Sequence, residues 1–211
     1  MTKQRRGSNM SLVRGLTIVL AASSAALAFA GGTAAAGSSY VRGDLPGIVD
    51  PKPAVPNWSF TEGHTYLLPT PVHAPAFTLS EFIGQSPTSG DRVFADKLAR
   101  AGFVIGRHRV WNGQGPRLPA KAVVFAFLFR TAPGAATGIR VIKPPGAGTR
   151  VEGLGDEAWK LDSHRGAVFL WRRGNLVVYA GADCGLDCGF SAAVPARAYA
   201  AELDARARRV A

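Results

Sequence analysis

The stretch that most constrains the fold is residues 151–182, VEGLGDEAWKLDSHRGAVFLWRRGNLVVYAGA. Its apolar runs predict three short strands joined by tight turns, at residues 156–161, 167–172 and 176–182. Gly153 and Gly155 mark a bend, because glycine reaches positive φ without a clash of Cβ. Gly174 and Asn175 stand between two apolar runs, which is typical of a hairpin turn. The pattern predicts an antiparallel meander at the centre of one sheet.

Helical and extended patterns alternate on both sides of the meander. A short amphipathic turn or helix is expected at 77–83. The other elements are a helix at 91–101, strands at 103–111 and 121–130, a helix at 131–143 and a last helix at 195–210. The most continuously apolar strand, KAVVFAFLFR at 121–130, is expected to be central and covered on both faces. The order α-β-β-α-β-β-β-α predicts an α+β domain, a mainly antiparallel sheet with helices packed on one face.

The first 36 residues have the character of a signal peptide. Residues 1–14 are basic, and residues 16–30 are an uninterrupted run of small and apolar residues. A run of about 15 residues suits the core of a signal peptide and is short for a membrane span, which needs about 20. Small residues predict cleavage after Ala30 or Ala36. We expect an exported protein, extracellular or at the cell envelope. The alternative is an uncleaved leader that anchors it to the membrane, and no other span is expected.

A proline-rich segment follows at 37–76 and holds half of the 14 prolines. Because proline lacks an amide donor and fixes φ, we expect neither a helix nor a central strand there. The segment is predicted to be a linker, or an arm laid over the domain, with a short edge hairpin through Glu62, Gly63 and His64. Residues 77–211 would then form the single α+β domain.

The chain is basic, with 25 Lys and Arg against 14 Asp and Glu and a formal charge of +11. One interpretation is a compositional bias spread over the whole chain. The other is a basic face for an anionic partner, such as a cell-wall or lipid component. We expect no nucleic acid as partner. Two predicted strands supply a basic and aromatic set that forms the candidate ligand-binding surface, namely Arg107, Arg109, Trp111, Arg172 and Arg173.

Cys184 and Cys188 are the only cysteines. Outside the cytoplasm such a pair predicts a disulfide that closes the loop before the last helix. A redox pair would usually be spaced C-x-x-C, and a metal site would need two more ligands, so we expect no metal and no cofactor.

No catalytic constellation is evident, and we expect no catalytic residues. Asp156 and Glu157 are adjacent on a strand, so they point to opposite faces and cannot share one substrate. The enzymatic alternative is a hydrolase or transferase whose fold brings His108 or His164 to one of these carboxylates. A second alternative is a structural or assembly role, in which the proline-rich arm docks on a partner.

Three patterns resemble a group of exported bacterial proteins with no agreed activity: GLGDEA at 153–158, VFxWRRGNxVV at 168–178 and FRTAPGA at 129–135. The group is similar to small actinobacterial cell-envelope lipoproteins and to the extracellular sensor domains of some receptor kinases. The resemblance covers 77–211 and implies location and fold more than chemistry. This chain lacks the lipidated cysteine of the lipoprotein members. We therefore expect an exported, non-enzymatic cell-envelope domain that binds a ligand or an anionic envelope component.

Overall fold

The computed structural model describes residues 39–63, 76–84, 89–115, 119–163, 166–183 and 192–211. These residues belong to one compact unit that spans 35–211. The predicted signal peptide and its two cleavage sites lie outside the described residues. Within the described ranges, no helix combines the length and the apolar composition needed to cross a membrane.

Eight strands form one antiparallel sheet in the order β1-β3-β4-β8-β7-β6-β5, and β2 pairs with β3 beside β1. The elements in chain order are η1 (Arg42–Asp44), α1 (Leu45–Val49), β1 (Ser59–Glu62), β2 (Ala76–Phe77), α2 (Leu79–Gly84), α3 (Ser89–Arg100), β3 (Phe103–Gln114), β4 (Pro119–Phe129), α4 (Ala132–Ile142), β5 (Thr149–Arg150), β6 (Glu157–Ser163), β7 (Gly166–Arg173), β8 (Leu176–Asp183) and α5 (Ala193–Val210). The α+β class is confirmed, and the predicted order corresponds to α3-β3-β4-α4-β6-β7-β8-α5.

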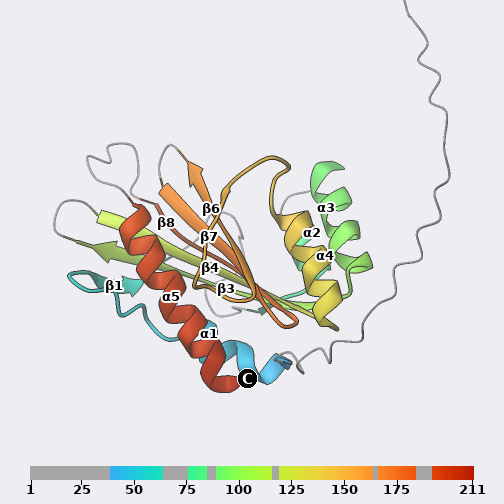
Figure 1. Cartoon of the computed structure of the whole chain (residues 1–211), viewed down its shortest axis with the longest axis horizontal. Helices are drawn as coiled ribbons and strands as arrows, with labels where there is room; N and C mark the ends of the chain where they lie inside the picture. The colour runs from blue at the N-terminus through green and yellow to red at the C-terminus, as the bar shows by residue number, and fades with distance from the viewer. Residues whose placement is uncertain (1–38, 64–75, 85–88, 116–118, 164–165, 184–191) are drawn as a thin grey trace, which may run out of the picture. The chain divides into compact units, whose positions relative to one another are not determined.

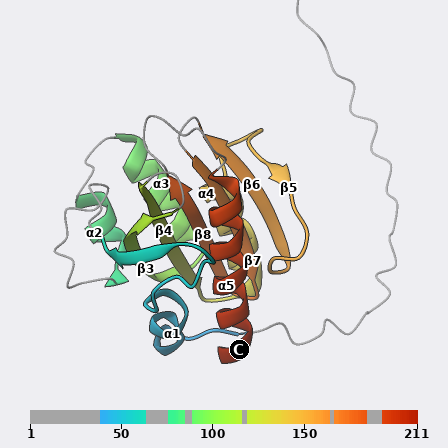
Figure 2. The same cartoon turned by 90° about the vertical axis from the view of Figure 1, so that its left-hand side faces the viewer.

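Helices cover both faces of the sheet, so the expectation that they pack on one face was wrong (Figures 1 and 2). On β4, Val124 and Leu128 face a core that α1 and α5 complete, while Phe127 and Phe129 face a second core completed by α3 and α4. A strand that is apolar on both sides needs cover on both sides. The continuous apolar run of β4 is therefore the feature that required two helical layers.

The proline-rich arm is built into the first core. Its helix α1 buries Leu45, Ile48 and Val49 at 2% exposure or less, and Phe60 of β1 is buried beside them. The expectation of no helix was wrong because Pro46 lies at the start of α1, where a missing amide proton costs nothing. Of the predicted hairpin, β1 is an edge strand paired with β3, and His64 lies outside the described residues.

Arg206 of α5 ties this arm to the rest of the domain. It is 6% exposed, and its guanidinium donates to the carbonyl oxygens of Ile48, Pro51 and Lys52 at 3.2, 2.9 and 3.0 Å. Glu202, one helical turn earlier, pairs with it. Deletion of the arm would expose both this guanidinium and the first core, so the arm is a structural part of the domain.

Candidate functional site

Two of the predicted binding arginines, Arg107 and Arg109, lie on one face of β3 because they are two residues apart on a strand. Arg107 donates to Asp50 of the arm, with Nε 2.6 Å from Oδ1. Arg109 contacts the same Oδ1 at 3.2 Å and Glu62 Oε1 at 2.9 Å. Their side chains are only 14% and 20% exposed. Two carboxylates thus balance two guanidinium groups, and little positive charge remains for a ligand.

Trp111, the aromatic member of the predicted set, is a core residue. It is 8% exposed and packs in the first core together with Phe60, Val124 and Tyr199. Alternation places it on the same face of β3 as the two arginines, and that face is covered by α1 and α5. Its ring therefore serves packing, not an open ligand surface.

Tyr199, in the same core, makes the stability of the domain sensitive to alkaline pH. Burial raises the pKa of its hydroxyl, while the positive charge of Arg206 acts in the opposite direction. Above the ordinary pKa of about 10 the unfolded chain loses a proton that the folded chain keeps, so stability falls as pH rises, by up to about 1.4 kcal/mol per pH unit. We expect urea unfolding from pH 9 to 11 to show a steeper loss for the wild type than for Tyr199→Phe. Equal slopes would contradict this assignment.

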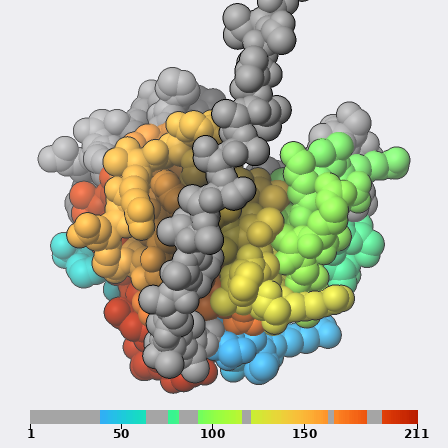
Figure 3. Space-filling model, turned by 45° about the vertical axis from the view of Figure 1, so that its right-hand side comes forward, coloured from blue at the N-terminus to red at the C-terminus, as the bar shows by residue number. Residues whose placement is uncertain are grey.

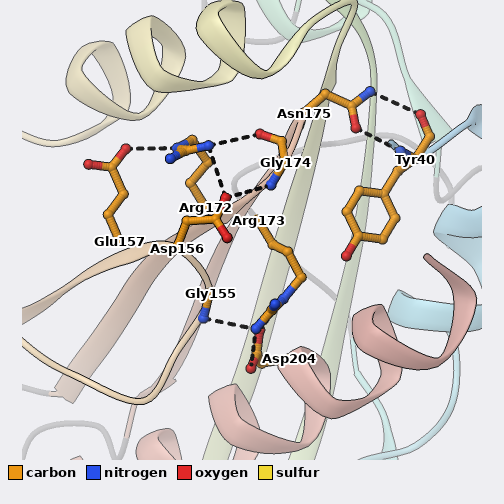
Figure 4. A network of polar contacts seen from close by, with 9 residues as sticks. All are labelled: Tyr40, Gly155, Asp156, Glu157, Arg172, Arg173, Gly174, Asn175 and Asp204. Carbon is orange, nitrogen blue, oxygen red and sulfur yellow. Dashed lines mark hydrogen bonds and ion pairs between the residues drawn. The ribbon is translucent and has the colours of Figure 1, made fainter. Parts of the chain in front are cut away.

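Arg172 and Arg173 are adjacent on β7 and point to opposite faces of the sheet (Figure 4). Arg172 donates to Glu157 Oε1 at 2.8 Å, to Asp156 Oδ2 at 3.0 Å and to the carbonyl oxygen of Gly174 at 3.1 Å. Both members of the acidic pair in the glycine-rich turn are therefore ion-pair partners of one member of the basic pair, Arg172.

Arg173 binds Asp204 of α5 through two parallel hydrogen bonds of 2.9 and 3.0 Å. The Asp204 side chain is 1% exposed and also accepts the backbone amide of Gly155 at 3.1 Å. Arg208 approaches the same carboxylate from solvent at 3.4 Å. We call the whole network the motif clamp, which comprises Gly155, Asp156, Glu157, Arg172, Arg173 and Asp204.

The hairpin turn that follows Arg173 connects the motif clamp to the start of the domain. Asn175 is 5% exposed. Its side chain accepts the amide of Tyr40 at 2.7 Å and donates to the carbonyl oxygens of Tyr40 and Phe129 at 2.9 and 2.8 Å. The three patterns that carry the resemblance therefore contact one another through Arg172 and Asn175 and hold distant segments together, which is a structural role.

The five predicted binding residues do not form one surface. Arg107 lies in register with Trp171 of β7, across β4 and β8. Three strand spacings of about 4.8 Å separate the two groups by about 14 Å. Each arginine of either group has its own carboxylate partner.

The residues of the enzymatic alternative are also apart. His108 is 8% exposed, with its ring stacked on that of Phe125 at 5.7 Å. Between it and Glu157 of β6 lie β4, β8 and β7, four spacings or about 19 Å, beyond the reach of proton transfer. His164 lies outside the described residues, as do Cys184 and Cys188 of the predicted disulfide.

A groove of about 350 Å³, which we call the polar groove after the polar residue types that line it, lies at the end of the strands opposite to Phe103 and Phe129. Four of its side chains stand in one row, because Thr61 is paired with Asn112, Asn112 with Lys121, and Lys121 with Asp183. All four are exposed. The full lining is Ser59, Thr61, Asn112, Gly113, Gln114, Lys121 and Asp183.

The polar groove was missed in the sequence because four strands from distant parts of the chain build it. Its local signal is modest: polar residues at the ends of apolar strands, such as Asn112 and Gln114 on β3 and Asp183 on β8. Only the register shows that these ends meet. By alternation, the groove lies on the face that carries the second core.

Comparisons with protein-family models, with curated proteins and with solved structures found no match. Within the described ranges, no group of three or more His, Cys, Asp or Glu side chains could hold a metal ion. The function is therefore inferred from the geometry of the chain itself.

Proposed function

We propose that the chain is an exported, non-enzymatic domain of the cell envelope that binds a polar ligand in the polar groove. The observation that carries the proposal is the row of four exposed polar side chains that four paired strands hold in register. Strands hold side chains more rigidly than loops, and a volume of about 350 Å³ is within the range of ligand pockets. The apolar and basic leader supports export.

The chemistry of the groove favours a neutral, hydroxyl-rich ligand. Amide and hydroxyl side chains both donate and accept hydrogen bonds, which suits the hydroxyl and acetamido groups of a glycan. Lys121 and Asp183 carry opposite charges on directly opposed positions, so the row has no net charge. Three strand spacings make the row about 14 Å long, enough for a short glycan segment. A wall glycan therefore fits better than the anionic partner expected from total charge.

A non-enzymatic role is supported because the candidate catalytic groups already have structural partners. Asp156 and Glu157 are bound to Arg172 in the motif clamp, and His108 is packed against Phe125 in the second core. The polar groove itself, as described, contains one carboxylate and no histidine.

Asn112→Ala tests the proposal, with an oligosaccharide of N-acetylglucosamine as the probe in calorimetry. We expect binding to weaken about tenfold or more, because the central amide of the row loses both its donor and its acceptor. Thr61→Ala should weaken binding less. Its matched control is Thr149→Ala, an exposed threonine on the edge strand β5, which should leave affinity unchanged. Absence of oligosaccharide binding by the wild type, or equal affinities of wild type and Asn112→Ala, would overturn the proposal.

A further inference from the structure

Exposed arginines and exposed valines gather at one end of the domain. We call this end the basic end, which comprises Val41, Arg42, Arg100, Val104, Arg130, Arg208, Arg209 and Val210. These residues come from η1, α3, β3, the β4–α4 turn and α5. Figure 1 shows the chain segments that carry them along the lower edge of the molecule.

Backbone contacts bring these segments together. The side chain of Asn175 joins Tyr40, next to Val41, to Phe129, next to Arg130. The amide of Arg130 donates to the carbonyl oxygen of Gly102 at 2.9 Å, and Gly102 lies between Arg100 and Val104.

The C-terminal turn of α5 reaches the same place. A Cβ at Gly47 of α1 would lie 3.9 Å from Cγ1 of Val210. In the space-filling view the blue N-terminal segment lies beside the red end of α5 along the lower edge (Figure 3).

The charges of the basic end are largely free of acidic partners. Arg208 pairs with Asp204, but no ion pair to Arg42, Arg100, Arg130 or Arg209 is found within the described ranges. The nearby Asp44, whose carboxylate accepts the amide of Val41 at 2.7 Å, contributes one negative charge against these arginines. By contrast, each of the four arginines that the sequence predicted to bind a ligand has a carboxylate partner, namely Arg107, Arg109, Arg172 and Arg173.

Apolar side chains accompany these charges. Val41, Val104 and Val210 are 62%, 46% and 39% exposed. Only two other large apolar side chains in the described part of the chain, Val93 and Val194, are comparably exposed. Exposed apolar residues among arginines are typical of surfaces that adsorb to anionic membranes, where charge attracts the head groups and apolar groups enter the interface.

Where the leader is retained, the point at which the chain enters the domain favours a membrane over other anionic partners. Residue 40 is fixed at the basic end, and the predicted apolar run ends at residue 30. The nine residues 31–39 between these points allow a separation of about 35 Å at most, so any membrane that holds the run is within reach of this end. We propose that the basic end docks on the surface of an anionic phospholipid bilayer. The polar groove, at the opposite end of the strands, would then face away from that bilayer.

The test is sedimentation with vesicles of phosphatidylglycerol and phosphatidylcholine, compared with vesicles of phosphatidylcholine alone, using the protein as recovered from its own cells. We expect Arg42→Glu with Arg130→Glu to lower partitioning onto the anionic vesicles about tenfold or more. The matched control is Arg140→Glu with Arg150→Glu, two exposed arginines outside the basic end, with the same change of charge. The control should retain most of the binding.

Three outcomes would overturn the proposal: equal loss in both double variants, no preference of the wild type for anionic vesicles, or retention by wall polyanions and not by vesicles. If a retained leader holds every variant on both kinds of vesicle, sedimentation does not report docking of the basic end. Amide hydrogen exchange is then the test. Slower exchange at 41–42 and 102–104 on anionic vesicles supports docking, and unchanged exchange excludes it. The proposal does not depend on the glycan site, because Asn112→Ala should leave vesicle binding unchanged.

Discussion

Replacement of Asp204 by alanine is expected to lower the free energy of unfolding by about 3–5 kcal/mol, as when one partner of a buried ion pair is removed. The Asp204 carboxylate is 1% exposed, and it accepts both hydrogen bonds of Arg173 and the amide of Gly155. Without it, a largely buried guanidinium and a backbone donor lose their acceptor. Urea unfolding followed by circular dichroism measures the loss.

Arg208→Ala is the control for this prediction. Arg208 contacts the same carboxylate at 3.4 Å, but its side chain is 56% exposed. An ion pair on the surface contributes about 0–1 kcal/mol, so this variant should be nearly as stable as the wild type. Similar losses for Asp204→Ala and Arg208→Ala would show that the motif clamp does not depend on the buried carboxylate.

Replacement of Gly155 by alanine should cost about 3 kcal/mol or more, or prevent folding, because strain and overpacking act together. Gly155 has φ +51°, and a Cβ there would lie 2.2 Å from the carbonyl oxygen of Arg172. That oxygen cannot move freely, since it accepts the amide of Asp156 at 2.6 Å. The yield of folded protein and its midpoint of urea unfolding measure the effect.

Gly153→Ala is the matched control, two residues earlier in the same turn. Gly153 also has positive φ, +75°, but the nearest atom to its Cβ would be an Arg197 nitrogen at 3.4 Å. Alanine there carries only the conformational penalty of about 1 kcal/mol. If the two alanine variants were equally stable, the collision with Arg172 would not matter.

The five long strands β3, β4, β6, β7 and β8 could be predicted because their causes are local, whereas β2 and β5 were not expected. The meander follows from glycine at turns and from apolar runs between them, and β6, β7 and β8 begin and end within two residues of the predicted bounds. The two helical layers were also implied locally, by Phe127 on one face of β4 and Leu128 on the other. The expectation that the strand at 121–130 is covered on both faces was correct, and it was incompatible with the expectation of helices on one face only.

The arm and the binding surface could not be predicted because their causes are not local. Arg107 has its acid partner 57 positions earlier, at Asp50, so a count of arginines on strands overstated the available charge. The proline count predicted no helix and missed that Pro46 suits the first turn of the short helix α1. Where distant residues are paired, charge in the sequence is a poor guide to charge on the surface.

The motif clamp also changes how binding experiments on this chain must be designed. Charge reversal of Arg172 and Arg173 would place five carboxylates, Asp156, Glu157, Asp204 and the two new ones, in the motif clamp. Asp204 would face one of the new glutamates from within the core. Loss of binding in such a variant would report loss of the fold, so arginines of the basic end are the appropriate targets.

The contacts of Tyr40 and of Arg206 also determine when the domain can fold. Asn175 holds Tyr40 across 135 positions of sequence, and Arg206 holds Ile48 across 158. The arm that contains α1 must therefore wait for α5 before its core can close. Contacts so distant in sequence slow folding. During synthesis the arm therefore stays without its closed core until α5 has been made.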